Sequence, residues 1–472
     1  MDMKKEKYFN FLKKALIYFL IFIFSFLCIT FLLYNHYLLF IILFSAIIFL
    51  SLKFNIKHFA ILLFIISFIS KLIFIKLFNF EQISDFKVLL DASFKFAKKD
   101  YSFSNDLYFK LWAYQTGFVA YQGLLLKIFK NIFILKILNI IYTSFLTVYI
   151  YLFGKELVSK KAAVVASLLY LIFPFPMFLN TILANHHISA FLMYIGIFLL
   201  LKNQKKLSNY ILAGILVGIG NIMRPEAIIV IFSYFVYWLF NLKKCNVKKS
   251  ILYLLVFIIC YISIGSLSSY VIKISNINNN GLTNNDPKWK FVLGFNHNSC
   301  GEYDFNDEQY LNNEKLENAV IKERVFSDPL KTIKLFSCKT NSFWLKNNLG
   351  TNNEEYLNKE FNLFKYKISY RKIMKEVNTF NYLIYIITFI MMLIGIIKNI
   401  KNIINSKSLY FLFLIITTFC VYLLIEIQAR YAYFIYISIF ILSCYGYDYL
   451  LNIINKKVNK IKKSKGNKLN KI

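Results

Sequence analysis

The sequence predicts an all-α polytopic membrane protein with about twelve transmembrane helices. Its 472 residues are 58% hydrophobic, 19% aromatic and only 17% charged, whereas about a quarter of the residues in a soluble domain are charged. The apolar residues form blocks, many of them near the roughly 20 residues that a helix needs to cross a bilayer. Short lysine clusters separate these blocks. The pattern excludes an ordinary soluble domain.

Twelve segments are candidate spans. In order they cover residues 15–34, 37–52, 59–78, 131–153, 162–179, 188–201, 209–223, 225–240, 250–270, 381–399, 408–425 and 430–450. No small-residue cleavage site follows the first span, so we interpret it as a retained helix rather than a signal peptide. The first two spans then form an amino-terminal hairpin.

The spans divide the chain into five regions. They are a basic segment with this hairpin (1–58), a transmembrane core (59–274) with a first external loop (79–130), a large external loop (275–380), carboxyl-terminal helices (381–455) and a basic tail (456–472). Long loops within a compact protein are usually functional. We therefore expect both loops to contribute to a functional site.

The net charge of +32 is explained by membrane topology rather than by nucleic acid binding. Lysine clusters fall on alternate loops, and the last 17 residues hold eight lysines and no acid. Such clusters mark cytoplasmic loops and attract anionic lipid. We expect both termini in the cytoplasm, with the lipid bilayer of the plasma membrane, not nucleic acid, as the partner.

Residues 207–240 have two interpretations. They form either one long helix interrupted at Arg224-Pro225-Glu226 or two short spans with these residues at the outer turn. A single helix would place every later loop on the other side and the lysine-rich tail outside, which the charge rule disfavours. Two spans preserve the alternation, and Pro225 then suits the start of the second helix, where its missing N–H costs nothing.

Both external loops contain predicted helical segments. The stretch 112–129 of the first loop is apolar but broken by glycine and glutamine, which favours a re-entrant or interfacial piece over a span. In the large loop, Asp328-Pro329 begins a helix that continues to about Leu345. An amphipathic helix lying along the membrane surface is predicted from apolar residues at helical spacing, which are Phe86, Leu89, Leu90, Phe94 and Ala97.

The cysteines and histidines do not predict a metal site. The seven cysteines lack metal-ligand spacing. His186 and His187 are neighbours, and neighbouring side chains point in different directions on a helix. Cys300 and Cys338 share the large loop, and whether they form a disulfide stays open at this stage.

Several ionisable residues fall at outer ends of the predicted spans. An acid and cations meeting there would suit general-base chemistry on a phosphate-linked substrate. Structural explanations compete: Asp85 as a solvated loop acid, Arg224 as a snorkelling side chain, and Glu426 with Arg430 as a simple pair four residues apart. The residues concerned are Asp85, Arg224, Glu426, Arg430, Lys339 and Trp344.

The order of these parts resembles the GT-C superfamily of membrane glycosyltransferases, and within it the protein O-mannosyltransferase and aminoarabinose-transferase branch. The resemblance covers roughly residues 59–450. It is carried by Asp85 soon after a helix end, by Gly-rich 213–223 ending in Arg224-Pro225, by the large external loop, and by the stretch Glu426 to Tyr431. The mannosyltransferases have an Asp-Glu pair in the first loop, whereas Phe86 follows Asp85 here.

The resemblance implies inverting transfer of a hexosyl or pentosyl group from a polyprenyl-phosphate donor to a hydroxyl of an envelope lipid, glycan or protein. Asp85 would then act as the base, and Arg224, Arg430 and Lys339 would bind the donor phosphate. No cofactor is implied, and no ligand cluster indicates a divalent metal. Supporting roles fall to Glu226, Glu426, Trp289, Asn296 and Trp344.

Two other functions stay open, and a purely structural membrane protein is a third alternative. One is a secondary transporter or lipid flippase, and the other is a glycan polymerase or ligase that uses lipid-linked saccharides. Transporters usually show paired halves and polar groups at mid-membrane. No internal repeat is visible, and Lys71 is the main charge within a span.

Overall fold

The computed structural model describes residues 11–23, 38–53, 56–78, 80–202, 206–242, 246–345, 360–363 and 366–469, and this part of the chain is almost entirely helical. Residues 11–23 are helical. The apolar helices that follow are α2 (Leu38–Leu52), α3 (Phe59–Leu77), α7 (Phe133–Leu157), α8 (Lys160–Leu171), α9 (Pro174–Leu179), α10 (His186–Lys202), α11 (Leu207–Met223), α12 (Ala227–Phe240), α13 (Val247–Ile274), α18 (Tyr370–Ile404), α19 (Ser408–Leu424) and α20 (Tyr433–Leu469).

Each predicted span that lies within the described residues overlaps one or more of these helices. Residues 24–34 of the first predicted span lie outside the described residues. Five described helices are long and apolar enough to cross a membrane, and five shorter apolar helices lie among them. The span 162–179 is divided into α8 and α9 just before Pro174, whose ring cannot continue a helix. The chain is thus a multi-pass membrane protein, while the count of twelve stays a prediction.

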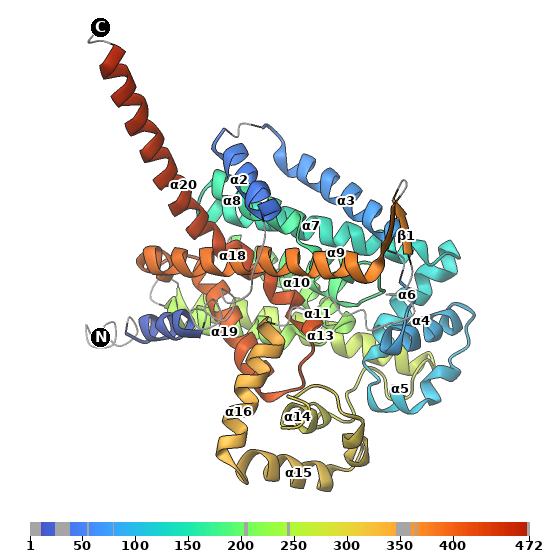
Figure 1. Cartoon of the computed structure of the whole chain (residues 1–472). Helices are drawn as coiled ribbons and strands as arrows, with labels where there is room; N and C mark the ends of the chain where they lie inside the picture. The colour runs from blue at the N-terminus through green and yellow to red at the C-terminus, as the bar shows by residue number, and fades with distance from the viewer. Residues whose placement is uncertain are drawn as a thin grey trace.

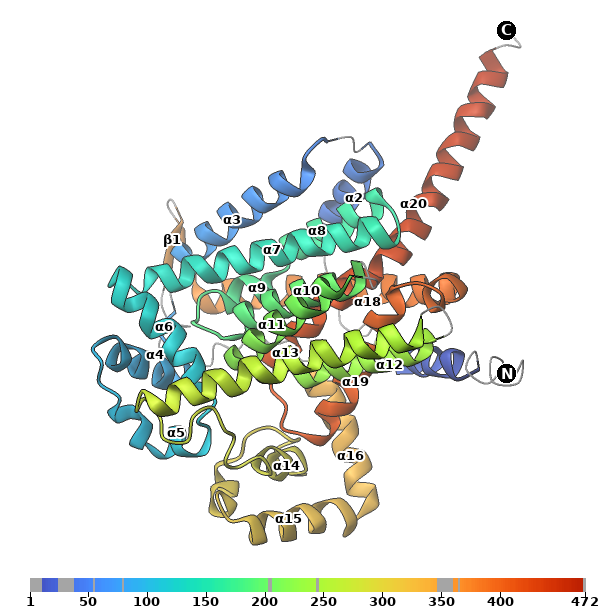
Figure 2. The same ribbon diagram turned by 180° about the vertical axis from the view of Figure 1, so that it is seen from behind.

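The long helices α3 and α13 are much more exposed than the central helix α20. Helix α20 packs against α18, α8, α19 and α7, and its apolar stretch is 83% buried. Helices α3 and α13 lie on the outside of the bundle (Figures 1 and 2), and their apolar windows are only 22% and 17% buried. Apolar side chains that the protein leaves uncovered are those that lipid can cover, so α3 and α13 are lipid-facing.

The contact between α18 and α20 depends on two small residues. Gly395 and Gly446 face each other, and a methyl group added at Gly446 would meet the carbonyl oxygen of Met391. Small residues let helix backbones approach closely. Gly446→Ala should therefore destabilise the protein by about 1–3 kcal/mol, measured as a lowered thermal unfolding midpoint in detergent. Gly265→Ala is the control, because a methyl there meets nothing within 4 Å; equal effects would contradict the assignment.

The chain reverses direction at Arg224-Pro225-Glu226, as the two-span interpretation requires. Tyr210 on α11 and Tyr234 on α12 form a hydrogen bond of 3.0 Å between their hydroxyl groups. In one continuous helix they would be separated by about 36 Å. Pro225 itself lies in the turn rather than at the start of α12, which begins at Ala227. Its expected position was therefore wrong by two residues, although the reversal is confirmed.

Lys71, the main charge within a span, is fully buried in α3. Its ammonium donates to the hydroxyl of Ser67 at 2.5 Å, to that of Thr147 at 3.2 Å and to the carbonyl oxygen of Thr143 at 3.3 Å. Neutral acceptors therefore satisfy this cation within the bundle, and no acid of the described chain pairs with it.

Two groups of shorter elements lie on the side of the bundle opposite the carboxyl end of α20 (Figures 1 and 2). The first group is α4 (Ser84–Ala97), η1 (Ser102–Asn105), α5 (Leu107–Leu111) and α6 (Gln115–Phe129). The second is α14 (Trp289–Gly294), η3 (Phe305–Tyr310), α15 (Glu314–Phe326), α16 (Pro329–Thr340) and η4 (Asn341–Leu345). A hairpin of β1 (Glu360–Leu363) and β2 (Tyr366–Ser369) pairs antiparallel, with Glu360 opposite Ser369.

The structure adds two details to the predicted loops. Helix α4 spans the predicted amphipathic segment, and its side chains of Phe86, Leu89, Leu90 and Phe96 are buried in the protein, whereas Phe94 is exposed. Helix α18 begins at Tyr370, within the predicted large loop 275–380. The predicted helix after Asp328-Pro329 is confirmed as α16, and Asp328 caps its first amide groups.

Candidate active site

A cavity of about 1140 Å³ lies where the two groups of short elements meet the ends of α10, α11, α13 and α19. Three predicted residues that are far apart in sequence, Asp85, Arg224 and Arg430, line it together. The charged lining residues are Asp85, Glu226, Glu308, Glu426, Arg224, Lys273, Lys290 and Arg430. Aromatic walls are supplied by Phe86, Tyr108, Trp112, Tyr114, Tyr270, Trp289, Tyr303, Tyr422 and Tyr431.

Asp85 lies in the first turn of α4 and is partly open to the cavity. One carboxylate oxygen accepts a hydrogen bond of 3.1 Å from Arg430, and the side chain is still 45% exposed. The preceding segment is held in place by Gln82, whose side chain bonds the backbone of Thr181 and Leu183. Ser84 has a positive φ of 51°, a conformation that non-glycine residues adopt at a cost and that clusters at functional sites. Asp85 is therefore a fixed carboxylate with room for a further partner.

Arg224 lies at the turn between α11 and α12. Its guanidinium donates to Glu226 at 2.5 Å and lies 4.6 Å from the ring centroid of Tyr431. Arg430 lies 5.7 Å from the same ring and 4.8 Å from that of Phe86. Both guanidinium groups are thus oriented by aromatic rings, and Tyr431 links the two cations.

Lys290 and Glu426 form a third acid–cation pair. The Lys290 ammonium donates to one Glu426 oxygen, and the Gln428 amide donates to the other at 2.7 Å. Burial alone would raise the pKa of Glu426, but the charge and hydrogen bond of Lys290 outweigh it and keep this pKa below its usual value. Burial likewise opposes the charge on Lys290, yet its pKa is raised, with the Glu426 carboxylate among the causes. The pair is therefore ionised.

Some polar groups of the site lack a protein partner among the described residues. The Nε atom of Arg430 and both ring nitrogens of His186 are buried and accept or donate no hydrogen bond there. No described acid pairs with Lys273, although Arg224, Lys290 and Arg430 each contact one. Buried polar groups are nearly always satisfied, so the Arg430 and His186 atoms mark where a polar ligand would bind, whereas Lys273 is exposed.

Three residues expected at the site do not line the cavity. Lys339 is buried, and its ammonium donates to the carbonyl oxygens of Gly294, Leu423 and Ile425 at 2.7–2.9 Å. Burial lowers the pKa of Lys339 to about 7. Trp344 packs between the rings of Phe343, Phe389 and Phe419. Asn296 binds two loop acids, Asp304 and Asp307. All three side chains make their contacts within the protein. Because the Lys339 ammonium already donates to three carbonyl oxygens, we do not propose that it binds the donor phosphate.

The helix that carries Trp289 and Lys290 begins at a pair of buried acids. Asp286 accepts hydrogen bonds from the backbone N–H groups of Trp289 and Asn312 at 3.3 and 2.9 Å. Burial, together with the neighbouring Asp286, raises the pKa of Glu317 to about 7. At Glu317 the folded loop therefore binds more protons than the unfolded chain does, between the ordinary pKa of 4.5 and about 7. Its stability should fall as the pH rises through that window and stay lower above it.

Glu317→Gln should remove this pH dependence, because the amide cannot ionise and can still donate to Asp286. We expect the variant to resist proteolysis of the loop equally at pH 5 and pH 7, whereas the unmodified protein is cut faster at pH 7. Glu323→Gln, an exposed position on the same helix, is the control. A Glu317→Gln protein that keeps the pH dependence would show that another group causes it.

Comparison with known families gives one match, which covers the middle of the chain. Residues 118–267 match the model of the dolichyl-phosphate-mannose-protein mannosyltransferase family. The match runs from α6 into α13 and includes Arg224 and Glu226. This match, which covers about a third of the chain, supports a membrane glycosyltransferase of the GT-C type. No curated protein and no solved structure matches it significantly.

The cavity residues that the sequence did not indicate are Lys290, Tyr431 as a cation-binding ring, His186 and Lys273. Lys290 lies on the short helix α14 of the large loop. Its partner Glu426 is 136 residues away in the sequence, and a contact of that range leaves no local pattern. The adjacent Trp289 was predicted and does line the cavity. Glu226 and Glu426 also lie where they were expected.

Proposed function

We propose that this protein transfers a hexosyl or pentosyl group from a polyprenyl-phosphate donor to a hydroxyl of an envelope lipid, glycan or protein, with inversion at the anomeric carbon. The observation that supports this most strongly is the meeting of Asp85 with Arg224, Lys290 and Arg430 in one cavity. Catalysis of glycosyl transfer from a phosphate needs a base for the acceptor and cations for the leaving group.

The proposed reaction uses the free side of the Asp85 carboxylate. Asp85 takes the proton of the acceptor hydroxyl while the hydroxyl oxygen attacks the anomeric carbon from the side opposite the phosphate. The bond from that carbon to the phosphate oxygen breaks, and the lipid phosphate leaves with the electron pair. Attack opposite the leaving group inverts the configuration.

The cations of the cavity would stabilise the departing phosphate. Arg224 and Arg430 flank Tyr431 and present guanidinium groups, which bind phosphate oxygens bidentately. The unpartnered Nε of Arg430 is a donor that the phosphate would satisfy. Lys273, without an acid partner among the described residues, adds a further cation at the lipid-exposed helix α13. The polyprenyl tail would then extend past α13 into lipid.

We further propose that the cavity faces the outside of the plasma membrane and that both termini are cytoplasmic. The lysine-rich tail supports this orientation by the positive-inside rule. The disulfide between Cys300 and Cys338 supports it independently, because disulfides persist in oxidising compartments.

The proposal is tested with membranes that contain the protein and a panel of radiolabelled polyprenyl-phosphate sugars. We expect label from one donor to reach a lipid, glycan or protein fraction only when the protein is present. If no donor of the panel transfers label and lipid-linked saccharides instead cross the bilayer, the flippase alternative is favoured and the proposal is wrong.

A further inference from the structure

Segment 423–427 runs from the last two residues of α19 into the connection to η5 (Ala429–Ala432), delivers Glu426 to the cavity and leads to Arg430 and Tyr431. Its residues 425–427 have no regular secondary structure. Its position must therefore be set by the elements around it, and the backbone groups show which ones do so.

The large loop holds this segment at several points. The Glu426 N–H donates to the Lys290 carbonyl oxygen at 2.8 Å, and the Ile427 N–H donates to that of Gly301 at 2.9 Å. From the other side, the Lys339 ammonium donates to the carbonyl oxygens of Leu423 at 2.8 Å and Ile425 at 2.7 Å. The segment thus lies between α14, the turn at Gly301 and α16.

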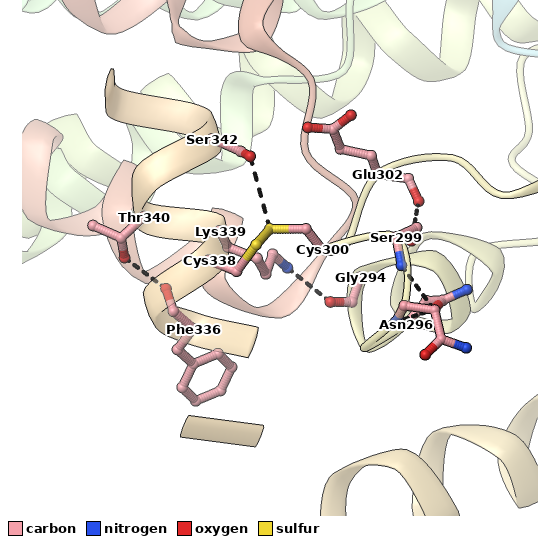
Figure 3. Close-up of a disulfide and its surroundings, with 11 residues drawn as sticks. Gly294, Asn296, Ser299, Cys300, Glu302, Phe336, Cys338, Lys339, Thr340 and Ser342 are labelled. Atoms are coloured by element: carbon pink, nitrogen blue, oxygen red, sulfur yellow. Dashed lines mark hydrogen bonds between the residues drawn. A yellow bond between two sulfur atoms is a disulfide. The ribbon is translucent and has the colours of Figure 1, made fainter. Parts of the chain in front are cut away.

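Lys339 also joins the loop elements to each other. Its third hydrogen bond reaches the Gly294 carbonyl oxygen at the end of α14, at 2.9 Å (Figure 3). The Cys300–Cys338 disulfide links the residue before Gly301 to the residue before Lys339, and Figure 3 shows it beside the Lys339 side chain. The disulfide therefore cross-links the turn at Gly301 to helix α16, next to the hydrogen bonds that both make to the segment.

Close packing leaves little freedom in this arrangement. A methyl group at Gly294 would meet the backbone of Leu424 and Ile425, and one at Gly301 would meet the aliphatic part of Lys339. Gly301 also has a φ of +75°, which side chains other than glycine rarely adopt. Both glycines permit the approach that the three Lys339 hydrogen bonds require.

We propose that Lys339 is a positioning residue that, together with the Cys300–Cys338 disulfide, fixes segment 423–427 so that Glu426 holds Lys290 in the cavity. Lys339 does not line the cavity and acts through Glu426. The positioning of segment 423–427 by Lys339 does not depend on which reaction the protein catalyses. The expected effect of Lys339 on turnover rests on the proposed function.

Hydrogen–deuterium exchange in detergent or nanodiscs tests the positioning without any substrate. In Lys339→Met, and in the Cys300→Ser/Cys338→Ser pair that keeps Lys339, the amides of Glu426 and Ile427 should exchange about tenfold faster or more. Peptides from α18 and the core of α20 should not change. Lys334→Met, exposed on the same helix, should leave all these peptides unchanged. Unchanged protection of Glu426 and Ile427, or equal loosening throughout the protein, overturns the proposal.

A double-mutant cycle on turnover tests whether Lys339 acts through Glu426. Lys339→Met should lower kcat about tenfold, with little further loss when Glu426→Gln is already present. Multiplicative losses in the double variant would assign Lys339 a merely structural role. If no variant and no unmodified protein transfers sugar while the exchange result holds, the proposed function fails and the positioning role stands.

Discussion

Replacing Asp85 by Asn should lower the rate of sugar transfer by about 10²–10⁴-fold, the range that a general base contributes. The amide keeps the shape of the side chain and can still accept from Arg430, which lies 3.1 Å away. It cannot take the acceptor proton, however. The measurement is transfer of label from the donor identified in the panel, at saturating donor and acceptor. The loss should appear in kcat, because donor binding uses other residues.

Asp91→Asn is the matched control for this prediction. Asp91 lies on the same helix, is exposed and does not line the cavity. Its replacement should leave the rate within about twofold, since exposed side chains away from special features contribute little. Full activity in Asp85→Asn, with normal membrane insertion, would remove Asp85 from the role of base.

The second large effect is expected at Arg224, combined with its partner because a buried Glu226 without a cation would itself disturb the site. Arg224→Met/Glu226→Gln should weaken transfer about 10²–10³-fold, the range for loss of one preorganised donor to developing charge. It should also raise the donor KM more than the acceptor KM. Steady-state kinetics with each substrate varied in turn measures both.

Two further variants separate charge from geometry at this position. Arg224→Lys keeps the positive charge but loses the planar group that stacks on Tyr431 at 4.6 Å, so an intermediate activity is expected. Arg371→Met, an exposed arginine outside the cavity, should have no effect. A double variant with an unchanged donor KM would refute the assignment of Arg224 to the donor phosphate.

Much of the fold was predictable because apolar blocks and lysine clusters act locally. The spans from 59–78 onward overlap the observed helices, and charge alternation correctly favoured a reversal at Arg224-Pro225-Glu226. The same alternation predicted that Asp85, Arg224 and Arg430 would lie on one side of the bundle, and they do line one cavity. The roles of these residues stay proposals.

The sequence could not specify which cations of the large loop reach the cavity. Lys290 and Lys339 are both lysines of the same loop, yet Lys290 lines the cavity and Lys339 binds backbone carbonyl groups. The difference arises from the approach of α14 to segment 423–427, which long-range backbone contacts and the disulfide determine. Such contacts leave no periodic pattern in the sequence. Trp344 and Asn296 lie outside the cavity lining for the same reason.

The most direct test of the account is photolabelling with a polyprenyl-phosphate analogue that carries a photoreactive group near the phosphate. If the cavity binds the donor phosphate, labelled peptides should contain residues 221–226, 265–273 or 422–431, and excess unlabelled donor should remove the label. Label restricted to the opposite ends of the helices, such as residues 206–210 or 157–162, would contradict the shared cavity as the donor site.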